Sequence, residues 1–147
     1  MKFLLGAVAF LLWVGFMIFI ESGSIAYFID MPSLIGPLIA AVAMIVITGK
    51  HKAAIAGLRA LISKKHQITE ADRIKAIKLY KLMRRAIWCA AVLFFVVSLI
   101  NIMSDVQNWE LFMRNLAVAG LSVFYAVLIN LILINPVIGI LEMRDNK

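Results

Sequence analysis

The chain has 147 residues, of which 64% are apolar and only 16% are charged, and its formal net charge is +7. Soluble domains are about 45–50% apolar and about 25% charged, so a soluble fold of this length would leave much apolar surface in water. Together with the mean hydropathy of +1.00, this excludes an ordinary soluble domain. We expect residues 1–147 to form a single membrane domain.

The first two apolar runs cover residues 3–20 and 31–48. A helix needs about 20 apolar residues to cross the hydrocarbon core of a bilayer, so each run predicts a transmembrane helix. For the first run a cleaved signal peptide is the alternative, although the apolar core of such a peptide is only about 7–15 residues long. Asp30 precedes the second run and is expected to cap its helix, with Pro32 in the first turn.

Two further apolar runs follow, at residues 86–103 and 112–141, and Arg114 is the single charged residue within them. Isolated strands leave backbone groups unpaired in lipid, so all four runs are expected to be helical. The predicted fold class is therefore an all-α polytopic membrane protein with four transmembrane helices, at about residues 3–20, 31–48, 86–103 and 112–141.

Positive charge is concentrated between the second and third runs. Residues 49–85 hold eleven of the fifteen lysines and arginines, whereas residues 21–30 and 104–111 hold none. Since cytoplasmic loops are enriched in these residues, the middle segment is predicted to be cytoplasmic, and with four spans both termini are too. These charges do not alternate with aromatic residues along a stripe, so binding of nucleic acid is not expected.

Apolar residues within 49–85 recur at helical spacings of three and four. The second span is therefore expected to continue as a helix to about residue 63. A new helix is expected to begin near Glu70, after an N-cap at Thr69, and to run into the third span. The two extended helices would form a short cytoplasmic hairpin over residues 49–85. Its basic cluster is either a topology signal on a solvated face or a surface that binds anionic lipid or a protein.

The predicted spans carry no carboxylate at depth, because every aspartate and glutamate lies at a predicted membrane edge or outside it. A carrier of protons or cations needs an ionisable group within the membrane, so a carboxylate would have to come from another chain if this protein moves ions. The sequence has no grouping typical of an enzyme nucleophile, a phosphate-binding loop or a metal site. We expect neither an enzyme nor a cofactor or metal.

Polar and small residues of the last two spans are the remaining candidates for function. In the fourth span they share one face or lie one step beside it, and in the third span they lie one helical step apart. They form either helix-packing contacts or a polar wall along an ion pathway. The candidates are Ser98, Asn101, Asn115, Ala119, Ser122, Tyr125 and Ala126.

Two stretches resemble the MotA family of flagellar stator subunits. Residues 27–35, YFIDMPSLI, resemble the FID-x-PSLL signature that opens the second span of that family, through Asp30, Pro32 and Ser33. Residues 116–136 resemble its last span, where Tyr125 and Pro136 match the pattern and Ser122 takes the place of a threonine. The order of two spans, a cytoplasmic segment and two further spans is also similar.

The resemblance implies a subunit of an ion-driven motor in the bacterial inner membrane. Proteins of this family and their relatives TolQ and ExbB form homopentamers around the transmembrane helices of a single-span partner, such as MotB or ExbD, which supplies the ion-binding aspartate. The third run here lacks the proline, glycine and threonine of the family pattern, and the cytoplasmic segment is shorter. The alternatives are a non-conducting MotA-like scaffold and a small four-span transporter.

Overall fold

The computed structural model describes residues 2–22, 24–62, 68–103 and 109–143, and these residues form helices with no β-strand among them. In chain order the elements are α1 (Lys2–Ser22), the 3-10 turn η1 (Ile25–Phe28), α2 (Met31–Thr48), α3 (His51–Ile62), α4 (Glu70–Met103), α5 (Trp109–Ile129), the π-helical turn η2 (Asn130–Ile134) and α6 (Asn135–Met143). The predicted all-α class is thus confirmed for the described residues.

Three helical stretches are long and apolar enough to cross a membrane. They are α2, α4 and the continuous stretch Trp109–Met143, which joins α5, η2 and α6. These stretches contain the predicted spans at 31–48, 86–103 and 112–141. The apolar part of α1, Leu5–Glu21, is shorter, so the count of four spans stays a prediction.

Helices α2 and α4 begin at the capping residues that the sequence indicates. The Asp30 carboxylate accepts a hydrogen bond from the Ser33 amide at 2.9 Å, and Pro32 lies in the first turn of α2. At the start of α4 the Asp72 amide donates to the Thr69 hydroxyl at 3.4 Å, and that hydroxyl donates to the Asp72 carboxylate at 2.7 Å. Both predicted caps are therefore confirmed.

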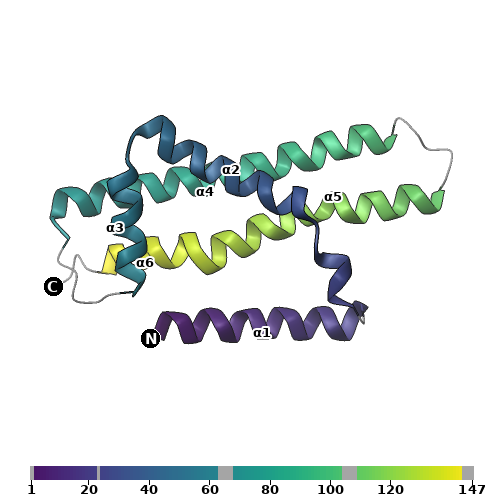
Figure 1. Cartoon of the computed structure of the whole chain (residues 1–147), viewed down its shortest axis with the longest axis horizontal. Coiled ribbons are helices and arrows are strands. Elements are labelled where there is room, and N and C mark those ends of the chain that lie inside the picture. The colour runs from purple at the N-terminus through teal and green to yellow at the C-terminus, as the bar shows by residue number, and fades with distance from the viewer. Residues whose placement is uncertain (1, 23, 63–67, 104–108, 144–147) are drawn as a thin grey trace.

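The expectation that the second span continues unbroken to about residue 63 is wrong. Helix α2 ends at Thr48, because Gly49 adopts a left-handed conformation with φ of +63° and caps its C-terminus. Helix α3 begins at His51 and runs steeply across α4 and α6 (Figure 1). Only α4 extends from the apolar region as one long helix, so the predicted hairpin of two extended helices over residues 49–85 is not confirmed.

The core of the bundle is the antiparallel pair of α4 with α5, η2 and α6, and α2 packs against both members of the pair (Figure 1). Several buried positions between α4 and α5 are small, including Ala91, Ala119 and Ala126, so these two backbones approach closely there. Larger side chains, including Leu79, Tyr80 and Ile87, fill the core where α3 and α6 join α4.

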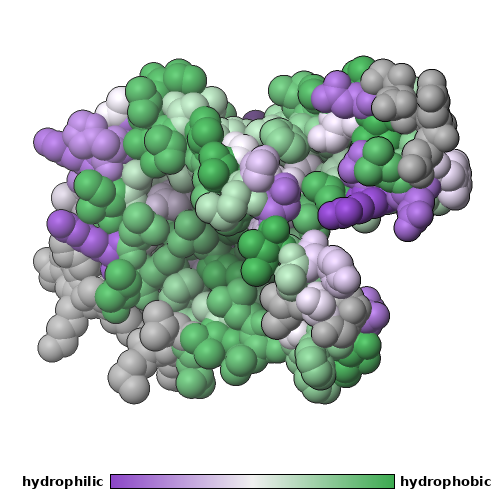
Figure 2. Space-filling view, turned by 45° about the vertical axis from the view of Figure 1, so that its right-hand side comes forward, coloured by the Kyte–Doolittle hydropathy of each residue, from purple (hydrophilic) through white to green (hydrophobic). Residues whose placement is uncertain are grey.

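Helix α1 stands apart, because it packs appreciably only on η1 and exposes large apolar side chains such as Leu12, Phe16 and Phe19. On the face drawn in Figure 2, hydrophilic side chains gather at two ends with hydrophobic surface between them. We call the end that carries α3 and the first turns of α4 the basic end, and the end near Glu110 the opposite end. This distribution is typical of a protein whose middle lies in lipid.

Candidate functional site

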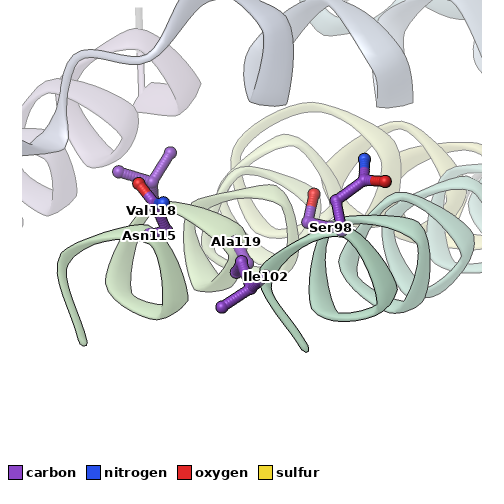
Figure 3. A pocket seen from close by; sticks show the side chains of 6 residues that line it. Ser98, Ile102, Asn115, Val118 and Ala119 are labelled. Carbon is purple, nitrogen blue, oxygen red and sulfur yellow. The ribbon is translucent and has the colours of Figure 1, made fainter. Parts of the chain in front are cut away.

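A polar hollow of about 280 Å³ opens between α4 and α5 toward the opposite end of the molecule. Figure 3 shows Ser98 and Ile102 of α4 on one side and Asn115, Val118 and Ala119 of α5 on the other. Its lining consists of Ser98, Asn101, Ile102, Asn115, Val118 and Ala119.

The base of the polar hollow is buried and its rim is open. Ile102 and Ala119 are buried, with exposed fractions of 8% and 2%, whereas Asn101 and Asn115 are exposed. The hollow therefore offers one hydroxyl and two carboxamides, which donate and accept hydrogen bonds but carry no charge at any ordinary pH. Of the predicted candidates, the structure brings Ser98, Asn101, Asn115 and Ala119 together here.

Ser122 lies one turn deeper along α5 and does not line the polar hollow. It is fully buried, and its hydroxyl lies 3.1 Å from the Ala91 carbonyl oxygen of α4 and 3.0 Å from the Ala119 carbonyl oxygen. The one hydroxyl proton of Ser122 therefore has two acceptors within reach, one on α4 and one on its own helix. Ala126, one further turn along, is also fully buried. For these two residues the geometry favours helix packing over a polar wall.

Tyr125 connects α5 to the segment that leads into α2. Its hydroxyl donates to the Phe28 carbonyl oxygen and accepts from the Asp30 amide at 3.3 Å. The Phe28 and Phe124 rings, with centroids 5.7 Å apart, add an apolar contact at the same place. Residues 27–35 and residues 116–136 therefore meet in the fold, where this hydrogen bond joins positions that are 95 residues apart in the sequence.

Ser33 lies in the first turn of α2 and is buried with an exposed fraction of 1%. Its hydroxyl oxygen has no hydrogen-bond partner among the described residues, while its amide is occupied by the Asp30 cap. Asp30 itself is only partly buried and acts through this cap. These contacts give Asp30, Pro32 and Ser33 a structural role at the start of α2, outside the polar hollow.

Pro136 follows the π-helical turn η2 and is the second residue of α6. Because Pro136 has no amide hydrogen, it cannot donate the hydrogen bond that normally reaches back four residues in an α-helix. One residue earlier, the Asn135 amide donates to the Asn130 carbonyl oxygen, which lies five residues back, as in a π-helix. The buried Asn130 side chain donates to the Ala126 carbonyl oxygen at 2.8 Å. The π-helical turn was not predicted; Pro136 within an otherwise continuous apolar run was the available signal.

Several residues of the basic end hold α6 against α4. The buried Arg73 guanidinium donates to the Leu141 carbonyl oxygen at 3.0 Å and to both Glu70 carboxylate oxygens, at 2.7 and 3.0 Å. The hydrogen bond from Arg73 lowers the pKa of the Glu70 carboxyl group below its usual value. Lys81 pairs with Glu142 at 2.7 Å. Part of the positive charge thus has a structural use that the sequence did not indicate.

Among the residues that the structure describes, no ionisable side chain lines the polar hollow. Among the described residues there is also no group of three or more histidine, cysteine, aspartate or glutamate side chains that could hold a metal ion. Cys89 is exposed on α4. The polar hollow therefore offers uncharged hydrogen-bonding groups, one hydroxyl and two carboxamides, beside apolar helices.

No protein-family model, curated protein or solved structure is significantly similar to this chain.

Proposed function

We propose that this protein is a MotA-like membrane subunit of an ion-driven motor complex. Several copies, five by analogy with that family, would surround the transmembrane helices of a single-span partner that supplies the ion-binding aspartate. The observation that carries the proposal is the polar hollow between α4 and α5, whose described lining residues supply hydroxyl and carboxamide groups but no ionisable group.

The chemistry of the polar hollow suits a supporting role in ion passage. A proton or cation at depth in a membrane requires a titratable or charged ligand, which Ser98, Asn101 and Asn115 do not provide. Their uncharged groups are suited to hydrogen-bond a carboxyl group, or the water around it, brought by another chain. A partner with an intramembrane aspartate would complete such a site.

The outer surface of α2 supports association of several copies. A shallow apolar hollow of about 460 Å³ runs along this helix and is lined by Ile35, Leu38, Ile39, Val42, Ala43, Val46 and Ile47. Side chains of this kind pack against another transmembrane helix as well as against lipid.

For the orientation we propose that the basic end faces the cytoplasm of a bacterial cell, in the inner membrane.

Native mass spectrometry of the complex, purified in mild detergent from the cells that naturally produce it, tests this function. The expected assembly contains five copies of this chain with two copies of a single-span protein that carries an aspartate within its span. A monomer or dimer without such a protein would contradict the proposal.

A second candidate is a MotA-like scaffold that does not conduct ions, and the geometry at Ser122 favours it. This hydroxyl is used between α4 and α5, so the row of polar groups is interrupted one turn below the polar hollow. A scaffold would give the same count of copies in native mass spectrometry, but its centre would hold lipid or remain empty. The presence or absence of an aspartate-bearing partner separates the two functions.

A further inference from the structure

Helix α3 lies at the depth of the lipid headgroups if α4 crosses the membrane. It crosses α4 at Tyr80, whose hydroxyl donates to the Ala54 carbonyl oxygen of α3 at 2.8 Å. The apolar stretch begins at residue 86, six positions after Tyr80, which is about 9 Å along a helix. The polar layer of a bilayer is about 5–8 Å thick on each side, so α3 crosses α4 at the outer edge of this layer and its side chains extend into it.

The contacts of α3 with the bundle fix which of its faces is exposed. Its buried residues are all small: Ala53, Ala54, Gly57 and Ala60. At Gly57 the ring of Tyr80 occupies the space where a side chain would begin. This close packing leaves α3 little freedom to rotate about its own axis, so the opposite face is held outward.

The exposed face of α3 is both apolar and basic. Ile55, Leu58 and Ile62 are 47%, 41% and 81% exposed, and their spacing of three and four residues places them in one stripe. Lys52 and Arg59, seven residues apart and both exposed, form a neighbouring stripe that lies about 40–60° around the helix from Ile55. The twelve residues of α3 include no aspartate or glutamate.

We propose that α3 is an interfacial helix that binds anionic lipid headgroups in the leaflet at the basic end. Ile55, Leu58 and Ile62 enter the boundary between headgroups and acyl chains, while Lys52 and Arg59 pair with lipid phosphates. Anionic lipid is the expected ligand for two reasons. The basic side chains of α3 complement its negative charge, and α3 lies beside the ends of α2 and of the apolar part of α4, where headgroups are found. This inference requires only that α4 crosses the membrane and does not depend on the motor function.

Spin labels measure the depth of α3 directly. The single cysteine is removed by Cys89→Ala, and labels are attached to Ile62→Cys, to Ile55→Cys and, as a control exposed on α4, to Lys75→Cys. In nanodiscs that contain phosphatidylglycerol, labels at the two α3 positions should collide more with oxygen than with a water-soluble nickel complex, and the control label should show the reverse. Preference for nickel at both α3 positions, or protection from both quenchers by a covering protein, would overturn the proposal.

Charge removal tests the choice of anionic lipid. For Arg59→Gln we expect the apparent affinity for phosphatidylglycerol, measured by native mass spectrometry of the protein with titrated lipid, to fall about fivefold. For Lys52→Gln with Arg59→Gln we expect a fall of about 25-fold. The matched single substitution Lys75→Gln, farther from the apolar stretch, should change it less than twofold. Equal effects of Arg59→Gln and Lys75→Gln would show that only net charge matters and would refute a site on α3.

Discussion

Replacing Ala126 by leucine is expected to lower the free energy of unfolding by about 1–3 kcal/mol. Ala126 is fully buried in α5, next to the turn where the Ser122 hydroxyl meets the Ala91 carbonyl oxygen of α4. Helices in lipid associate mainly by close packing, because apolar side chains gain little by leaving a hydrocarbon environment. Three additional carbon atoms at this position must therefore push neighbouring helices apart.

The matched control is Ala117→Leu, because Ala117 lies on the same helix but is exposed. This substitution should change the unfolding free energy by less than about 0.5 kcal/mol. Unfolding by titration of sodium dodecyl sulfate into protein held in a mild detergent measures both values. If the two variants unfold alike, the close contact of α5 with its neighbours is refuted.

The second large effect is expected for Gly57→Ala, which should weaken the docking of α3 by about 1–3 kcal/mol. A Cβ atom at this position would collide with the ring of Tyr80. This ring cannot move aside at low cost, since Tyr80 is 1% exposed and its hydroxyl donates to the Ala54 carbonyl oxygen. Trypsin cleavage after the exposed Arg59 in detergent should become roughly 5- to 150-fold faster, if α3 opens and closes rapidly compared with cleavage.

The control for this prediction is Gly139→Ala in α6, where no described atom beyond the neighbouring residues and backbone of the same helix lies within 4 Å of the added carbon. Alanine favours a helix over glycine by about 0.5–1 kcal/mol, so this variant should be as stable as the parent protein or more stable. Equal cleavage rates in Gly57→Ala and Gly139→Ala would contradict the contact between α3 and Tyr80.

Local signals in the sequence predicted much of the secondary structure. The caps at Asp30 and Thr69 mark the starts of α2 and α4 because a side-chain oxygen satisfies free amides within three residues, which requires no knowledge of the fold. The apolar runs at 86–103 and 112–141 were located by composition alone. Helix α1, in contrast, is apolar all around, so no face of it predicts what it packs against.

The path of α3 was not predictable from periodicity. Apolar spacing shows that residues on both sides of Gly49 are helical, but it does not show whether they belong to one helix. The left-handed backbone of Gly49 separates α2 from α3, and a glycine near the end of an apolar run was the available signal. The direction of α3 depends on the fit of Gly57 against Tyr80, a contact between distant residues.

The candidate site was predicted in part. The sequence placed Asn115, Ala119 and Ser122 on one face of a helix, but the structure divides this face, with Asn115 and Ala119 at the polar hollow and Ser122 in the contact with α4. The two environments lie one helical turn apart on α5. Which of them a residue occupies depends on how far α4 extends beside α5. The sequence of one helix does not contain that information.

The proposed motor function requires that α4 crosses a bilayer with its basic end in the cytoplasm. In a Cys89→Ala background, single cysteines at the exposed positions of Lys78 and Glu110 are treated with a membrane-impermeant maleimide in cells whose inner membrane is intact. We predict that Glu110→Cys reacts at once and that Lys78→Cys reacts only after lysis. Rapid labelling of Lys78→Cys in intact cells, or equal labelling of both positions, would contradict the proposed topology and with it the motor function.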